Sequence, residues 1–379
     1  MIILIVGSDA NACSIAERVS KSPNVDVVFM TSNERLCNFA QNIDLPETDS
    51  AELLDFAIAN EVAFTIVTSL LAIQNNIAEV FADARQQIFA PFAQAAAIGI
   101  YKSTAKKTMY RLKIPTMKFG IFEREVPAIE YASSSRKTLV IKNDTHILGE
   151  HPVFASTFKQ AKSAIEHCFL YPDNKVIIED CIDASKVAIY FITDGYTALP
   201  IGSVCPDEVF GWTDEIYAPD KYISDELELK ILREVIYPVI DDLAERSQPY
   251  CGILGVDLLV QDEMYNVVEF LPFFKPIHLQ TILPLIKTNL TDLFLSAACG
   301  SLSDDYSHVD FYNCSAFSKV IPNVSREAFE LLDDKKLNLL NFDKQAILTQ
   351  CASTAGRAKS VLMENIKFFK ECEAENEQS

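Results

Sequence analysis

The chain has 379 residues, 49% of them hydrophobic, which is enough for two or three domains with hydrophobic cores. Its 53 acidic residues outnumber its 33 lysines and arginines, so the formal net charge is −20. Such a surface repels a phosphate backbone and anionic lipids, so we expect neither nucleic acid nor an anionic membrane as a partner.

The ten cysteines are scattered without a C-x-x-C pair. This distribution is typical of reduced, apolar thiols and not of a disulfide framework or a zinc site, so we expect a cytoplasmic protein. The first residues, MIILIVGSD, carry no basic leader, and their apolar run is short. They predict a first β-strand, not a signal peptide, and no apolar run is long enough to cross a bilayer.

Strands and helices alternate over the first 112 residues. Strands are predicted at 2–6, 25–30, 64–67 and 87–90, and helices up to about 21, then at 33–41, 50–60, 72–84, 91–100 and 102–112. Because the strands are continuously apolar, they indicate a parallel sheet covered on both faces. The turn after the first strand, G-S-D-A-N-A, does not match G-x-G-x-x-G, which argues against a dinucleotide site.

After residue 112 the predicted strands are closely spaced, which indicates an α+β unit. Strands are predicted at 117–122, 138–142, 152–155, 175–180, 186–193 and 197–204, and helices at 124–133 and 157–169. A long helix is predicted over 225–246, with a kink or break at Pro238, followed by a hairpin of 252–260 and 265–271. The last 80 residues predict a strand, a helix, a strand, a final helix over 354–370 and a frayed polar tail.

The stretch from Thr138 to Ser156 raises the functional question. Its apolar strand ends at Lys142, and the loop that follows holds Asn143, Asp144 and Gly149. A lysine beside such a loop could contact a nucleotide phosphate. The loop also holds Glu150, which would repel one.

Several segments spread over the chain point to a family. They include FAPFAQAAAIGIYKSTAKKTMYRLKIPT, LVIKND, VIIEDCID, VIYPVIDDLAERSQPYCGILGVDLLV and ILTQCASTAGRAKSVLMENIKFF. In this order they resemble phosphoribosylamine–glycine ligase, also called glycinamide ribonucleotide synthetase, of the ATP-grasp superfamily. The resemblance implies an N-terminal parallel α/β (pre-ATP-grasp) domain over 1–112, an ATP-grasp domain over 113–300 whose smaller lobe spans about 113–190, and a small C-terminal α+β domain over 301–379.

The resemblance also implies site residues, with ATP and Mg²⁺ as cofactors if the ancestral site is still used. Lys142 matches the family's first phosphate-contacting lysine, and Glu179, Asp180 and Ile182 lie where the family binds adenine. Glu269, with Asp257 on the paired strand, would hold the metal. From the residues alone, Lys142 could equally be a strand-end lysine that reaches water, and Glu269 a strand-end carboxylate paired with it.

Many positions of the family's site are changed. In the metal motif, Leu271, Phe273, Pro276 and His278 replace an asparagine, an arginine, an aspartate and a glutamate, and Lys186 replaces a ribose-binding glutamate. We expect His278 to be a structural or surface residue.

The substrate positions are changed as well. In the first turn, which holds the ribose phosphate in the family, the arginine is absent and Asp9 is acidic. Trp212 lies where the family has a glycine-rich loop, and we expect it to pack over a vacant cleft.

These replacements predict a catalytically degenerate member that serves as a scaffold or binds a protein partner and needs no cofactor. The apolar run 271–285 is expected to fill the old cleft as core; the other possibility is a partner surface. One alternative is an active carbon–nitrogen ligase of purine biosynthesis that keeps Lys142, Glu179 and Glu269 and recruits Asp144, Asp257 or His278. The other is a small-molecule sensor.

Overall fold

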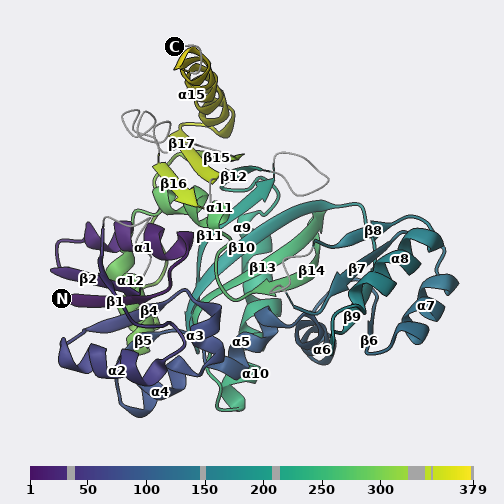
Figure 1. The fold of residues 1–379 in the computed structure, drawn as a ribbon, viewed down its shortest axis with the longest axis horizontal. Coiled ribbons are helices and arrows are strands. Elements are labelled where there is room, and N and C mark those ends of the chain that lie inside the picture. The colour runs from purple at the N-terminus through teal and green to yellow at the C-terminus, as the bar shows by residue number, and fades with distance from the viewer. Residues whose placement is uncertain (32–38, 146–150, 207–213, 323–337, 343–344, 377–379) are drawn as a thin grey trace.

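The structure is a computed structural model, and it describes residues 1–31, 39–145, 151–206, 214–322, 338–342 and 345–376 (Figure 1). These residues form a five-stranded, a four-stranded and an eight-stranded sheet. Gly149, Glu150 and Trp212, which the sequence analysis singled out, lie outside the described residues.

The N-terminal sheet is parallel, with the strand order β3-β2-β1-β4-β5. Its strands are β1 (Ile2–Val6), β2 (Val27–Thr31), β3 (Gln41–Ile43), β4 (Phe64–Val67) and β5 (Ile88–Phe89). Ile3 and Ile5 face one hydrophobic cluster with α1 (Ala10–Ser20) and α12 (Leu290–Cys299). Leu4 and Val6 face another with α2 (Ser50–Ala59) and α4 (Ile77–Asp83). The predicted parallel sheet with two covered faces is confirmed.

The predicted single helix over 72–84 is wrong. The segment 72–84 holds two helices, α3 (Leu70–Gln74) and α4, because Asn76 adopts a left-handed backbone (φ 58°) between them. Most of the predicted helix 33–41 lies outside the described residues, and its last residue, Gln41, begins β3. The helices α5 (Ala93–Ile100) and α6 (Lys102–Leu112) agree with prediction and lead to the next sheet.

The four-stranded sheet is antiparallel, with the order β6-β9-β7-β8. Its strands are β6 (Phe119–Phe122), β7 (Leu139–Asn143), β8 (Val153–Ala155) and β9 (Val176–Asp180), and its helices are α7 (Glu125–Ser134) and α8 (Phe158–Cys168). Ile141 of β7 and Ile178 of β9 pack in a cluster with both helices. Since side chains alternate along a strand, Lys142 and Glu179 lie on the opposite face.

The eight-stranded sheet is antiparallel, with the order β14-β13-β10-β11-β12-β15-β17-β16. Its strands are β10 (Ser185–Asp194), β11 (Ala198–Pro206), β12 (Glu215–Ala218), β13 (Cys251–Gln261), β14 (Met264–Leu271), β15 (Ser315–Pro322), β16 (Asn338–Phe342) and β17 (Gln345–Ala352). Through the β12–β15 pairing, the C-terminal strands continue the central sheet. The division at residue 300 therefore stays a prediction.

The predicted long helix is interrupted before Pro238. It consists of α9 (Asp225–Ile231), a π-helical turn (Leu232–Ile236) and α10 (Tyr237–Glu245). Proline has no N–H to donate, and the wide turn adapts the backbone to this loss, so the predicted break is confirmed. The last helix, α15 (Ala355–Asn376), runs past residue 370, so a tail frayed from residue 371 is wrong.

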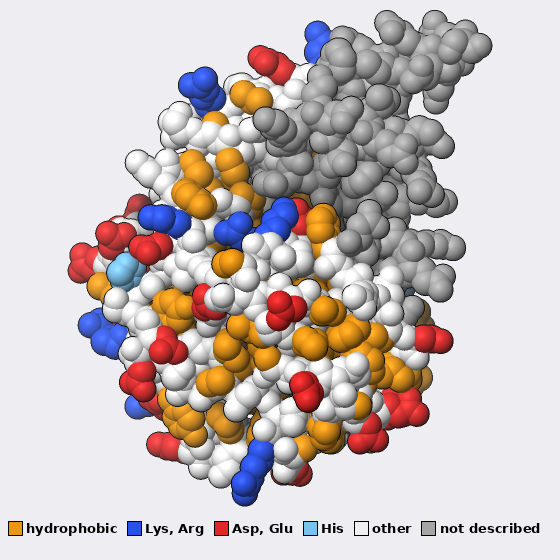
Figure 2. Space-filling view, turned by 90° about the vertical axis from the view of Figure 1, so that its left-hand side faces the viewer, with side chains coloured by type: hydrophobic (Ala, Val, Ile, Leu, Met, Phe, Trp, Pro, Cys, Tyr) orange, Lys and Arg blue, Asp and Glu red, His pale blue; other side chains and the backbone are white. Residues whose placement is uncertain are grey.

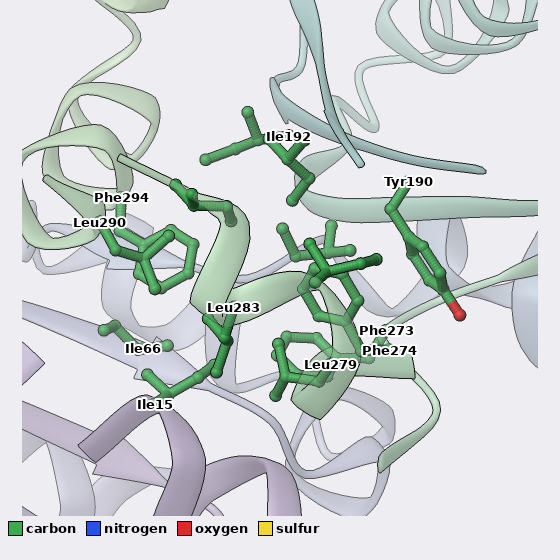
Figure 3. Packing of buried hydrophobic residues seen from close by; sticks show 14 of the residues in the cluster. Ile15, Ile66, Tyr190, Ile192, Phe273, Phe274, Leu279, Leu283, Leu290 and Phe294 are labelled. Atoms are coloured by element: carbon green, nitrogen blue, oxygen red, sulfur yellow. The ribbon is translucent and has the colours of Figure 1, made fainter. Parts of the chain in front are cut away.

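The run 271–285 connects the N-terminal and central sheets. It forms the end of β14, α11 (Pro276–Ile282) and a 3-10 turn (Leu283–Leu285), and it leads to α12 and α13 (Leu302–Asp305). Phe273, Phe274, Leu279 and Leu283 are buried in one cluster with Ile15 and Ile66 of the N-terminal part and with Tyr190 and Ile192 of β10 (Figure 3). The prediction that this run forms core is confirmed.

Acidic residues are spread over the face of the molecule that Figure 2 shows. On the side of the molecule that Figure 2 shows, aspartates and glutamates are interspersed with uncharged and apolar side chains. Among the described helices, none combines the length and the apolar character that crossing a membrane requires.

Candidate functional site

Helix α6 contributes two lysines to the site. Lys102 and Lys106 are four residues apart, so they lie on one face of the helix. Both are buried, Lys102 at 8% and Lys106 at 1% exposure. Lys106 donates from Nζ to Thr116 Oγ1 at 2.7 Å, which fixes its position beside β6.

Glu179 joins Lys106 to Lys142. Strands β7 and β9 pair so that Val140 lies opposite Glu179. This pairing places the Lys142 side chain next to the Glu179 carboxylate on the same face of the sheet. The Lys106 ammonium pairs with Glu179 Oε1 and the Lys142 ammonium with Oε2. Glu179 is fully buried. Burial opposes its charge, but Lys142 and Lys106 outweigh burial and lower the pKa of this carboxyl.

Burial and the nearby carboxylates shift the pKa values of these lysines in opposite directions. Burial lowers the pKa of Lys102 and of Lys106, against the attraction of nearby carboxylates. For Lys142, burial is outweighed by Glu179 and Glu269, and its pKa is raised. Lys142 therefore stays charged, and the interpretation that it is a strand-end lysine reaching water is wrong.

Asp257 and Glu269 lie opposite each other on β13 and β14. Asp257 is fully buried, and its Oδ2 lies 2.8 Å from Lys275 Nζ and 3.3 Å from Lys186 Nζ. Burial opposes the charge of Asp257, but the two lysines lower the pKa of this carboxyl far below its usual range. Lys186 is thus an ion-pair partner in this structure and not merely a lost acceptor.

Asp144 completes the cluster. It accepts hydrogen bonds from the Ser103 backbone N–H at 2.7 Å and from Ser103 Oγ at 2.9 Å. The cluster then holds one more cation than anions, in a chain whose net charge is strongly negative. Its lysines are Lys102, Lys106, Lys142, Lys186 and Lys275, and its carboxylates are Asp144, Glu179, Asp257 and Glu269.

His278 is bound inside the protein. Its Nδ1 lies 2.7 Å from Tyr190 Oη, and the Tyr190 ring packs against Phe274 at 4.5 Å between ring centroids. Burial, reinforced by Lys275, lowers the pKa of His278 to about 3, so the imidazole is neutral. These contacts support the interpretation that His278 is structural.

The first turn is satisfied by its own chain. Asp9 caps α1, with Oδ1 accepting from the Ala12 N–H at 2.9 Å and from Thr68 Oγ1 at 3.2 Å. Burial raises the pKa of Asp9. Asn11 Nδ2 donates to the Phe274 carbonyl at 2.9 Å, which ties this turn to the run 271–285.

The structure brings together four of the six predicted site residues. Lys142, Glu179, Asp257 and Glu269 converge; Asp180 lies on the other face of β9, paired with Lys137 at 2.6 Å. Ile182 lies in the linker between β9 and β10, and in the described part of the chain its backbone N–H makes no backbone hydrogen bond.

The sequence analysis did not assign four residues to the site: Lys102, Lys106, Tyr190 and Lys275. The spacing K-x-x-x-K could have indicated the two lysines of α6. Lys275 could not be found this way, because its partner Asp257 is 18 residues away on another strand.

Comparison with known proteins establishes the family. The phosphoribosylglycinamide synthetase N domain matches residues 1–99, and the ATP-grasp (A) domain of the same synthetase matches residues 101–277. The chain belongs to the phosphoribosylglycinamide synthetase family. The predicted resemblance and the multidomain ATP-grasp fold are confirmed, and the family is one of ATP-grasp ligases.

The sequence relatives are distant. The phosphoribosylamine–glycine ligase of Haemophilus influenzae is 27% identical over 327 residues, covering 82% of this chain and 76% of the relative. That of Lactococcus lactis is 27% identical over 311 residues, covering 79% and 76%.

Three solved structures share the fold. Phosphoribosylamine–glycine ligase from Thermotoga maritima has a TM-score of 0.73 at 13% identity and covers 95% of both chains. The biotin carboxylase domain of 2-oxoglutarate carboxylase from Hydrogenobacter thermophilus, solved with MgADP and bicarbonate, has 0.73 at 12% and covers 95% and 88%. Carboxyaminoimidazole ribonucleotide synthase from Aspergillus clavatus, solved with ATP, has 0.70 at 13% and covers 98% of each.

Proposed function

We propose that this chain binds ATP between the β6–β9 lobe and the β13–β14 hairpin, and that it does not join phosphoribosylamine to glycine. The main observation behind this proposal is that the two halves of the site differ. Buried lysines remain where a triphosphate would lie, whereas the chain's own side chains occupy the half where an acceptor substrate would lie.

The nucleotide half offers positive charge. Lys102 and Lys106 of α6 and Lys142 of β7 are buried, and Glu179 pairs with two of them, Lys106 and Lys142. Positive charge is left over, because the whole cluster holds one more lysine than carboxylates. Among the described residues, Lys102 is the cluster lysine whose ammonium has no ion-pair partner. A buried lysine in this position gains by meeting an anion, since a compensating charge offsets its loss of hydration.

The linker after β9 offers a place for the base. The N–H of Ile182, which makes no backbone hydrogen bond in the described chain, can donate to a ring nitrogen. Two proteins of the same fold were solved with MgADP and with ATP, which supports a nucleotide as the ligand.

The acceptor half is filled. Phe273 and Phe274 lie in the core between the N-terminal sheet and β10, next to Tyr190 (Figure 3). Tyr190 is itself held by the buried His278. The Asp9 carboxylate accepts a hydrogen bond at the N-terminus of α1, a position that would otherwise attract a phosphate. A substrate phosphate at this turn would meet a carboxylate, and a sugar would have to displace two phenylalanines.

The test measures binding and catalysis separately. In calorimetry we expect saturable ATP binding by the wild type, weaker by at least about tenfold in Lys102→Met, since one charge-assisted phosphate contact is lost. Lys107→Met is the matched control, because Lys107 is an exposed neighbour on the same helix and should leave binding unchanged.

The second measurement adds phosphoribosylamine, glycine and MgCl₂, and we expect no ADP above background. ADP release that depends on both substrates would establish an active ligase instead. If ATP does not bind at all, the scaffold role is favoured, because the ion pairs of Glu179 with Lys106 and Lys142 would then serve only the structure.

A further inference from the structure

We infer that the site takes ATP without a divalent cation, and that Lys186 and Lys275 supply the positive charge a metal would otherwise bring. This inference rests on the proposed binding of ATP and concerns what accompanies the nucleotide. It is carried by the arrangement around Asp257, the carboxylate that with Glu269 would form the metal site.

The residues present do not fit Mg²⁺. Beside a nucleotide the ion binds one or two protein carboxylates, and water and phosphate oxygens complete its octahedral shell. Asp257 Oδ2 is already engaged by Lys275 Nζ at 2.8 Å and by Lys186 Nζ at 3.3 Å. A cation on this carboxylate would lie beside two ammonium groups and be repelled by both.

The neighbouring positions do not supply another carboxylate for the ion. Leu271 and Phe273 follow Glu269 on the chain and are buried in core. His278 is committed to Tyr190. Among the described residues, no group of three or more histidines, cysteines, aspartates or glutamates could hold a metal ion.

The two lysines are suited to replace the ion. Both are anchored by Asp257, which is fully buried in the middle of β13, while 24% of the Lys275 and 33% of the Lys186 side chain is exposed. Their ammonium groups can therefore contact Asp257 and a phosphate oxygen together. Two single charges match the charge of one divalent ion, and a lysine binds phosphate as a point charge.

One observation leaves a metal ion as an alternative occupant that the experiment must exclude. Asp257 Oδ1 is buried and has no hydrogen-bond partner among the described residues. A metal held there through one oxygen is the alternative that the experiment must separate from the lysine arrangement.

The experiment is a calorimetric titration of the full chain with ATP, in EDTA and in excess MgCl₂. We expect binding in EDTA at least as tight as in MgCl₂, because metal-free ATP presents more charge to the lysines. In Lys186→Met/Lys275→Met we expect binding in EDTA to weaken by at least about thirtyfold, and MgCl₂ to restore part of it, because Asp257 becomes free for the ion.

Each outcome is decisive. Wild-type binding that requires MgCl₂ would overturn the inference and leave the proposed ATP binding intact. Absence of binding in both buffers would overturn the proposed function itself. Lys107→Met again controls for loss of a surface charge. Should the double variant not fold, as judged by circular dichroism, the single Lys275→Met and the wild-type comparison in the two buffers still decide.

Discussion

The buried carboxylate Glu179 allows a sharp test of the site. Replacing it with glutamine keeps its shape but removes the charge that Lys106 and Lys142 share. Those lysines are 1% and 6% exposed, and Glu179 is fully buried. Breaking a buried ion pair from one side costs about 3–5 kcal/mol, because the partner's charge is left uncompensated. We therefore expect Glu179→Gln to lower the free energy of unfolding by about that amount.

Urea unfolding followed by circular dichroism measures this change. Lys137→Met is the matched control, since it removes an exposed ion pair with Asp180 at the end of the same strand and should cost less than about 1 kcal/mol. The combined variant Glu179→Gln/Lys106→Met should recover part of the loss, because one orphaned cation is gone. A cost for Glu179→Gln no larger than the control's would refute the view that these charges are desolvated.

Substitutions at three further residues test the remaining parts of the account. Phe274→Ala should lower the free energy of unfolding by about 3–5 kcal/mol in the same urea assay, because the ring is buried against Tyr190; a loss below about 1 kcal/mol would mean that the cleft is not filled. His278 has its folded pKa near 3, below its unfolded value, so its contribution to stability is lost as pH falls. Between pH 6.5 and 4.5 the wild type should lose about 2 kcal/mol more than His278→Gln, and equal pH dependence would contradict a buried neutral imidazole. Asp9→Asn should retain the helix cap, whereas Asp9→Ala should lose about 1 kcal/mol; equal losses would argue against capping.

Local patterns in the sequence predicted much of the fold. The continuous apolar strand 2–6 indicated burial on both faces, and Pro238 indicated a break, because both signals depend only on neighbouring residues. The division of 70–83 into two helices was not predicted, because the left-handed Asn76 is a single-residue feature within an apolar stretch. The hairpin turn is shorter than predicted, with positive φ at Asp262 and Glu263, which few non-glycine residues adopt.

The site was only partly predictable. Lys142 and Glu179 could be placed by alternation along their strands, which puts them on the face away from the helices. The pairing of Asp257 with Lys186 and Lys275 depends on how β10 aligns with β13 and on the turn after β14. Such long-range geometry has no local signature, so the sequence showed lost ligands where the structure has new ion pairs.

The central claim is that the nucleotide half is retained while the acceptor half is closed. One sample can test it: the wild type is titrated with ATP to saturation in MgCl₂, and ADP is measured after phosphoribosylamine and glycine are added. The account predicts saturable ATP binding and no ADP that depends on the two substrates. ADP formed in proportion to glycine would contradict it, because the space occupied by Phe273 and Phe274 would then have to admit a substrate.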